Sequence, residues 1–184
     1  MSDATAPPPA QADDKDWTWV LEQPCPDCGA DVGSLTMPEV AALNRQVAAG
    51  FADVLRGRAD VRDRPSPEIW SPLEYGAHVR DVFRLFLVRL ELMLTEDDPT
   101  FANWNPNETA EADRYDLLDP ATVADELVAD AEVLASRFES LTADQLTRTG
   151  RRSDGASFTV ESFARYEIHD PMHHLWDVGG IDRW

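Results

Sequence analysis

Apolar residues recur at intervals of three and four positions in four stretches of the chain. This spacing places the apolar side chains on one face of an α-helix. The first predicted helix begins after Thr36, where Pro38 and Glu39 complete an N-terminal helix signal, and it ends near Gly57. Its apolar stripe consists of Val40, Leu43, Val47, Phe51, Val54 and Leu55.

Three further helices have equally clear boundaries. The second begins at Ser71, again followed by a proline and a glutamate, and it is the most apolar helix of the chain. The third begins at Asp119, and the fourth runs from Thr159 to a glycine pair that starts at Gly179. Four amphipathic helices and little predicted strand indicate an all-α protein, an antiparallel four-helix bundle.

A long connection separates the second and third helices. It covers residues 95–119 and offers Phe101, Trp104 and Tyr115 as aromatic anchors. A connection of this length is usually functional or forms a crossover between helices that run in parallel. The stretch before the fourth helix is predicted to be irregular, with a small hairpin that turns at Asp154–Gly155.

The N-terminal part of the chain lacks the helical pattern. Residues 1–14 are mainly Ala, Pro, Asp and Gln, a composition that predicts a mobile tail. They have neither the basic start nor the apolar stretch of a secretory signal. A segment with Trp17 and Trp19 follows, and we expect it to pack against the domain. We therefore divide the chain into an extension over residues 1–35 and a helical domain over residues 36–184.

Composition excludes several classes of partner. The net charge of -19 argues against binding to nucleic acid, which needs clustered Lys and Arg. No apolar run approaches the roughly 18 residues of a membrane span, so no membrane partner is expected and the protein is predicted to be cytoplasmic. Fifteen of the sixteen basic residues are arginine, a bias typical of a coding background rich in G and C.

Three of the four histidines lie in the last predicted helix, and the fourth, His78, lies in the second. His169 and His173 are four residues apart and project from one helix face, which is how a helix gives two imidazoles to one metal ion. His174 lies about 100° round the helix from His173 and is excluded from that pair. Pro171 is expected to bend the helix between them. The spacing predicts an open metal site of His78, His169 and His173; the alternative is that these histidines are merely hydrogen-bonded.

The only two cysteines, Cys25 and Cys28, form a CPxCG turn that is typical of a metal knuckle. A closed zinc site needs four ligands, and the chain has no second knuckle. The pair is therefore a redox pair, half of a site shared in a homodimer, or two reduced thiols in a tight turn. We expect that the cysteines do not bind the histidine-held metal, because His78, His169 and His173 already complete a three-ligand site.

Two motifs together resemble a known family. The sequence WSPLEYGAHVRDV, at Trp70–Val82, followed by HDPMHHLWDV, at His169–Val178, resembles the DinB-like metal-binding four-helix bundles. The resemblance covers roughly residues 36–180. It implies a divalent metal, often zinc or nickel, held by His78, His169 and His173. The family includes thiol S-transferases that use bacillithiol, mycothiol or glutathione, and mycothiol-dependent maleylpyruvate isomerases.

The expected chemistry follows from the ligands. A metal ion held by neutral imidazoles keeps its positive charge, and it lowers the pKa of a bound thiol or water. We therefore expect a metal-dependent transferase that activates a low-molecular-weight thiol for attack on an electrophile. The arginine bias favours a mycothiol-like thiol. The alternative is a non-catalytic helical module that binds a metal or a partner. Four carboxylates either orient the imidazoles or are simply exposed on their helices, namely Glu74, Asp81, Asp170 and Asp177.

Overall fold

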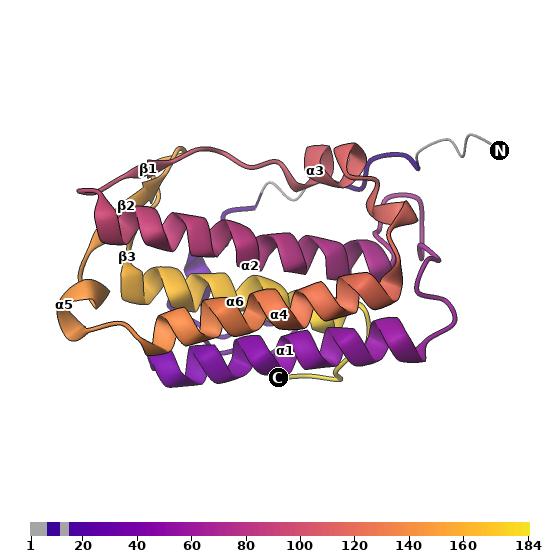
Figure 1. The fold of residues 1–184 in the computed structure, drawn as a ribbon, viewed down its shortest axis with the longest axis horizontal. Coiled ribbons are helices and arrows are strands. Elements are labelled where there is room, and N and C mark those ends of the chain that lie inside the picture. The colour runs from indigo at the N-terminus through magenta and orange to yellow at the C-terminus, as the bar shows by residue number, and fades with distance from the viewer. Residues whose placement is uncertain (1–6, 12–14) are drawn as a thin grey trace.

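Four long helices form the body of the protein in the computed structural model, which describes residues 7–11 and 15–184 (Figure 1). They are α1 (Met37–Gly57), α2 (Pro72–Thr95), α4 (Pro120–Glu139) and α6 (Val160–Asp177). This arrangement confirms the predicted four-helix bundle. The shorter elements are η1 (Thr18–Leu21), β1 (Thr100–Phe101), α3 (Pro106–Ala112), η2 (Tyr115–Leu117), α5 (Ala143–Leu146), β2 (Thr149–Arg152) and β3 (Ser157–Thr159).

Each long helix begins where its sequence predicts. Thr36, Ser71, Asp119 and Thr159 are the N-cap residues of α1, α2, α4 and α6. At the start of α2, for example, the amide of Glu74 donates to the Ser71 hydroxyl at 3.3 Å. These bonds satisfy backbone N–H groups that have no partner within the helix. α6 continues through Pro171 to Asp177, so His169 and His173 lie on one helix.

The chain direction in Figure 1 explains the long connection. α1 and α6 run one way along the bundle, and α2 and α4 run the opposite way. α1 packs most extensively on α4, with which it is antiparallel, and α2 packs antiparallel to α6. Because α2 and α4 run in parallel, residues 96–119 must return the chain along the bundle. The connection is therefore a crossover, one of the two roles that its length predicted.

The crossover is ordered by its aromatic residues and by a small sheet. Phe101 and Tyr115 are buried, and Trp104 packs partly buried against the core, so all three predicted anchors are confirmed. Strand β1 pairs in parallel with β2, and β2 pairs antiparallel with β3 across a turn at Asp154–Gly155. The predicted hairpin is confirmed. Strand β1 is not predicted by its sequence, because two residues carry no readable alternation.

The described part of the N-terminal extension is attached to the bundle. Five of its side chains are buried in the main core: Val20, Cys25, Cys28, Ala30 and Val32. The predicted mobile tail falls partly on residues 1–6 and 12–14, which lie outside the described residues. Within residues 7–11, the amide of Gln11 donates to the carbonyl of Glu68 at 2.9 Å, so this part follows the bundle surface. The division of the chain at residue 36 stays a prediction. Among the described residues, no helix is both long and apolar enough to cross a membrane.

One buried polar pair joins α1 to α6 beneath the histidines. The Asn44 side chain donates to the Glu167 carboxyl group at 3.2 Å, and both residues are completely buried. Burial raises the pKa of Glu167 from its ordinary 4.5 to about 8, although the bond from Asn44 opposes this. The carboxyl group is therefore neutral in the folded protein at pH 7.

This raised pKa predicts a pH-dependent loss of stability. The pKa of Glu167 is higher in the folded than in the unfolded chain. The stabilisation that the protonated Glu167 gives the folded state is therefore complete below pH 4.5 and is lost as the pH rises through about 8. The loss is about 1.4 kcal/mol for each pH unit in that window. The Glu167→Gln variant should lack it in denaturant unfolding measured from pH 5 to 8. Glu161→Gln, at a more exposed position of α6, is the control, and parallel curves for wild type and Glu167→Gln would contradict the prediction.

Candidate functional site

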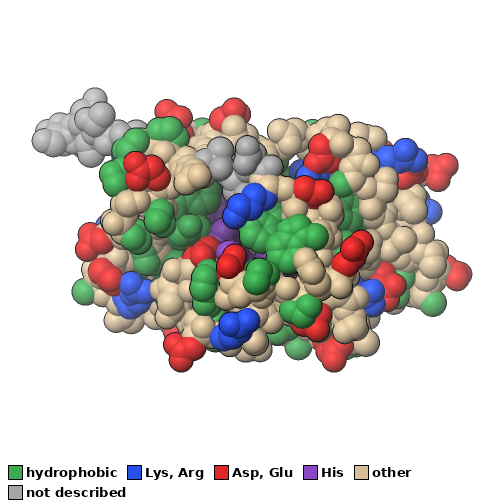
Figure 2. Space-filling view, turned by 180° about the vertical axis from the view of Figure 1, so that it is seen from behind, with side chains coloured by type: hydrophobic (Ala, Val, Ile, Leu, Met, Phe, Trp, Pro, Cys, Tyr) green, Lys and Arg blue, Asp and Glu red, His purple; other side chains and the backbone are tan. Residues whose placement is uncertain are grey.

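A cavity of about 440 Å³ lies between α2, α6 and the crossover. Figure 2 shows histidine side chains at the floor of a hollow on this face, with apolar side chains around them. All four histidines line the cavity, and so do several aromatic side chains from distant parts of the chain: Trp17, Trp70, Tyr75, Phe86, Trp104 and Tyr166. Its size is within the usual range for small-molecule sites, roughly 300–1,000 Å³.

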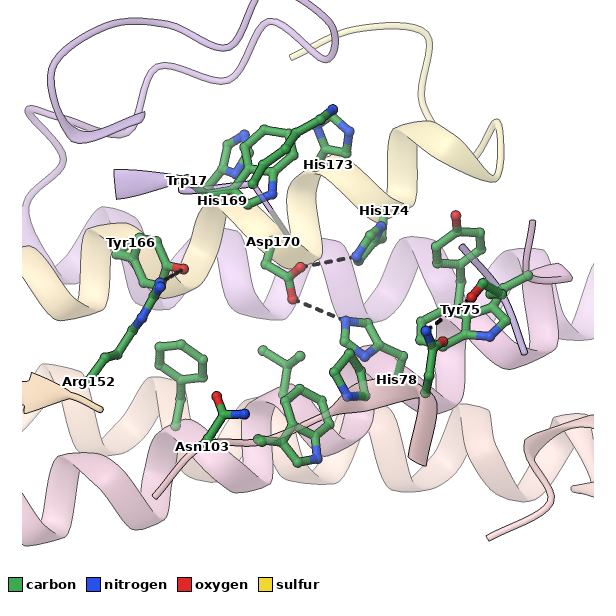
Figure 3. Close-up of a pocket in the computed structure, with 18 of the residues that line it drawn as sticks. Trp17, Tyr75, His78, Asn103, Arg152, Tyr166, His169, Asp170, His173 and His174 are labelled. Carbon is green, nitrogen blue, oxygen red and sulfur yellow. Dashed lines mark hydrogen bonds and ion pairs between the residues drawn. The ribbon is translucent and has the colours of Figure 1, made fainter. Parts of the chain in front are cut away.

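Three side chains from α2 and α6 converge in this cavity (Figure 3). Asp170 lies between two imidazoles, with one carboxylate oxygen 3.4 Å from Nε2 of His78 and the other 3.0 Å from Nε2 of His174. Their ligand atoms all lie within 4.8 Å of one another. We call His78, Asp170 and His174 the open group, because two imidazoles and a carboxylate leave coordination positions free on a metal ion.

His174 is held from its second nitrogen as well. Its Nδ1 lies 2.9 Å from a carboxylate oxygen of Asp177, one turn along α6. When Nδ1 donates a hydrogen bond to Asp177, Nε2 faces His78 and Asp170. A carboxylate that orients an imidazole in this way is the usual second partner of a metal-binding histidine. Two of the four predicted orienting carboxylates, Asp170 and Asp177, therefore do reach histidines.

The charged side chains of the open group shift one another's pKa values. Burial alone would lower the pKa of His174, but the carboxylates of Asp170 and Asp177 outweigh it and raise that pKa to about 10. Burial alone would raise the pKa of Asp170, but the imidazoles of His174 and His78 hold it well below its ordinary value. Asp170 therefore remains a carboxylate and His174 is protonated at pH 7 in the metal-free protein, so a metal ion that binds in the open group must displace the Nε2 proton of His174.

Aromatic side chains fix the imidazole of His78. Trp104, from the crossover, stacks on the ring with 3° between the planes and 5.3 Å between centroids. Trp70 packs against it at 5.2 Å. Nδ1 of His78 is buried and has no hydrogen-bond partner among the described residues. The ring is thus oriented by packing, which leaves Nε2 directed at Asp170.

The remaining two histidines face the N-terminal extension. Sγ of Cys25 lies 3.6 Å from Nδ1 of His173, and Sγ of Cys28 lies 3.9 Å from Nε2 of His169. All four ligand atoms lie within 4.8 Å of one another. We call these residues the closed group. Burial raises the pKa of Cys28 to about 12, and burial followed by the charge of His173 lowers the pKa of His169 to about 4.

The structure therefore divides the predicted ligands between two groups. His169 and His173 form one pair on α6, whereas Asp170 and His174 form a second pair that is rotated by about 100°. The first pair faces the cysteines, and the second faces His78. Positions of side chains alone do not test a single site of His78, His169 and His173, which stays a prediction. The geometry places His78 beside Asp170 and His174 rather than beside His169 and His173. The sequence did not predict Asp170 and His174 as ligands.

The comparisons with known proteins define the class of the chain. Residues 44–178 match the family model of the DinB superfamily, which is most of the chain, so the protein belongs to this superfamily. The resemblance that its two histidine motifs indicate is thereby confirmed.

Two individual proteins are similar to the chain. A candidate metal-dependent hydrolase of Halalkalibacterium halodurans is 33% identical over 111 residues, which are 58% of this chain but only 61% of that protein. The structure of YfiT from Bacillus subtilis superimposes with a TM-score of 0.70 at 17% identity and covers 79% of this chain and 89% of YfiT. YfiT is described as a probable metal-dependent hydrolase with an unusual four-helix bundle topology. At this identity the likeness establishes the fold.

Proposed function

We propose that this protein is a metal-dependent enzyme whose divalent ion is held by the open group and whose substrate occupies the adjoining cavity. The observation that carries the proposal is the convergence of His78, Asp170 and His174 in a cavity large enough for a small molecule. Two imidazoles and one carboxylate suit zinc, nickel and other divalent ions. The names of both similar proteins, as metal-dependent hydrolases, support it.

Neighbouring side chains orient the two imidazoles of the open group. Asp177 fixes the rotation of the His174 ring, and Trp70 and Trp104 fix that of His78. A divalent ion bound by such a set supplies Lewis acidity, which lowers the pKa of a coordinated water or thiol toward neutrality. Ligands that are already oriented lose little conformational freedom when they bind.

Hydrolysis is the reaction that we favour. Figure 3 shows polar side chains on the wall that faces the open group, where Arg152 donates to the Tyr166 hydroxyl at 2.7 Å and Asn103 projects from the crossover. These groups can hydrogen-bond to a polar substrate and hold a carbonyl or related centre near the ion. Trp70 and Trp104 supply apolar contacts for the rest of the substrate.

Thiol transfer is the second candidate. A cavity of about 440 Å³ has room for a small organic thiol beside an electrophile, whereas a hydrolase needs room for only one organic molecule besides water. In that reaction a mycothiol-like thiol would release its proton to solvent, and the thiolate would form a carbon–sulfur bond with the electrophile as the leaving group departs.

A single assay separates the candidates. The protein is loaded with zinc or nickel and offered a panel of esters, amides and alkylating electrophiles, each with and without mycothiol, bacillithiol or glutathione. Turnover without thiol supports hydrolysis, and turnover only with thiol supports transfer. Metal-loaded protein that converts nothing under either condition would favour the non-catalytic module and contradict the proposal. His78→Ala, which lacks one proposed ligand, is the negative control.

Loss of the orienting carboxylate should weaken metal binding without abolishing it. Asp177→Asn keeps the size of the side chain but removes the charge that lies 2.9 Å from Nδ1 of His174 and, through its other oxygen, 3.7 Å from Nε2 of His173. Partners of this kind usually account for a factor of roughly 10–100 in metal affinity. We expect such a decrease in a competitive zinc titration. Asp53→Asn, at an exposed position of α1, is the matched control, and equal affinities for both variants would contradict the role of Asp177.

A further inference from the structure

We infer that Cys25, Cys28, His169 and His173 form a second metal site, a closed four-ligand zinc site that fastens the N-terminal extension to α6. This inference does not depend on the proposed function, because none of the four residues belongs to the open group. It replaces our expectation from the sequence that the cysteines bind no histidine-held metal. The two CxxC sulfurs are one half of a zinc site, and the HxxxH pair on α6 is the other half.

Two sulfur–nitrogen separations in the closed group are close to those of tetrahedral zinc. Zinc–sulfur bonds of about 2.3 Å and zinc–nitrogen bonds of about 2.0–2.1 Å place neighbouring sulfur and nitrogen ligands about 3.6 Å apart. The observed separations are 3.6 Å for Cys25 and His173 and 3.9 Å for Cys28 and His169. Both sulfurs belong to free cysteines, so neither is taken up in a disulfide.

The turn that carries the cysteines is built to bring both sulfurs to one point. The amide of Cys25 donates to the carbonyl of Ala30 at 2.8 Å, and the amide of Gly29 donates to the carbonyl of Cys25 at 2.9 Å. Gly29 has φ +84°, and a Cβ there would lie 2.6 Å from the Arg183 side chain. Only glycine fits this conformation and this contact easily, so the turn is fixed in shape.

Three of the four ligands are buried, and His173 is partly buried. Cys25 and Cys28 are buried to 1% and 0% exposure, and His169 to 3%. Trp17 lies 5.3 Å, between centroids, from both the His169 and the His173 rings (Figure 3). The last residue of the chain covers the other side, because the Trp184 amide donates to the carbonyl of Cys28 at 3.0 Å.

Charge and ligand number both favour a structural zinc ion. Two thiolates balance the double positive charge of zinc, so a neutral cluster is buried rather than an isolated charge. Four protein ligands complete the tetrahedron and leave no position for water or substrate, as in other closed zinc sites. The site would therefore fix α6 against the extension, while Asp170 and His174, one residue further along, belong to the open group.

The absorption spectrum of the full-length protein loaded with cobalt tests the inference without an activity assay. Cobalt bound by thiolates gives a sulfur-to-metal charge-transfer band in the near ultraviolet, and tetrahedral cobalt gives strong visible bands. We expect both in the wild-type protein, with binding of two cobalt ions per chain. The spectrum of the wild type is decisive by itself, and it needs no variant to fold. Cobalt binding without a thiolate band would overturn the inference.

Variants at neighbouring histidines assign the band to its ligands. His173→Ala and Cys28→Ser should each bind cobalt in the closed group much more weakly than the wild type does, and the double variant Cys25→Ser, Cys28→Ser should lose the thiolate band and bind one cobalt ion rather than two. His174→Ala, changed at the next residue, should keep the band and lose the other ion. If the proposed function is wrong and the open group binds no metal, the wild-type protein should bind one cobalt ion and still show the thiolate band of the closed group. A thiolate band that forms with unchanged cobalt affinity in His173→Ala, or that disappears in His174→Ala, would contradict the ligand set.

Discussion

His174→Ala should lose the metal ion of the open group and, with it, the metal-dependent reaction. His174 supplies one of only three ligands, and its Nε2 lies 3.0 Å from the carboxylate of Asp170. Removal of a direct ligand should lower metal affinity by more than the roughly 10–100-fold that loss of an orienting partner causes. Turnover should fall in parallel, because the cavity would retain its shape but not its cation.

A zinc titration and the turnover assay check this prediction together. The control is His169→Ala, which removes an imidazole from the same helix but from the closed group. Its open group should still bind metal. If His174→Ala retained full occupancy at that site while His169→Ala lost it, the single site of His78, His169 and His173 would be favoured instead.

Arg64→Ala should cause a large loss of stability, although Arg64 lies outside the metal sites. The Arg64 guanidinium donates to both carboxylate oxygens of Glu74, and the Glu74 side chain is only 4% exposed. Without Arg64 a buried carboxylate remains unpaired, which costs about 3–5 kcal/mol. At about 2–4 °C for each kcal/mol in a chain of this size, the unfolding midpoint should fall by about 6–20 °C. Glu74 also accepts the amide of Ser71 at 2.8 Å, so α2 would lose support one turn before His78.

Two further variants show whether the unpaired charge is the cause. Arg64→Ala combined with Glu74→Gln should recover part of the lost stability, because no buried charge remains. Arg56→Ala breaks an ion pair with Asp125 whose side chains are 48% and 77% exposed, and it should cost at most about 1 kcal/mol. Equal losses in Arg64→Ala and Arg56→Ala would contradict the explanation.

The helices were predictable because their signals are local. Thr36, Ser71, Asp119 and Thr159 each combine a capping side chain with the start of an apolar stripe, and each is an N-cap in the structure. Strand β1 was not predictable, because its two residues pair with a strand about 50 positions later in the chain. Such a contact depends on the crossover as a whole.

The grouping of the ligands likewise depends on contacts between distant segments, which local sequence signals do not reveal. Spacing reveals that His169 and His173 share a helix face, but it does not reveal which segment lies against that face. Asp170 and His174 have the same four-residue spacing on an adjacent face. A signal was nevertheless present, because two cysteines without partners and two histidines on one helix face add up to the four ligands of a closed zinc site.

The most direct test of this account is to locate bound zinc by anomalous diffraction from crystals of the metal-loaded protein. We predict two peaks, one between Cys25, Cys28, His169 and His173 and the other between His78, Asp170 and His174. A single peak coordinated by His78, His169 and His173, with both sulfurs and Asp170 unbound, would contradict it.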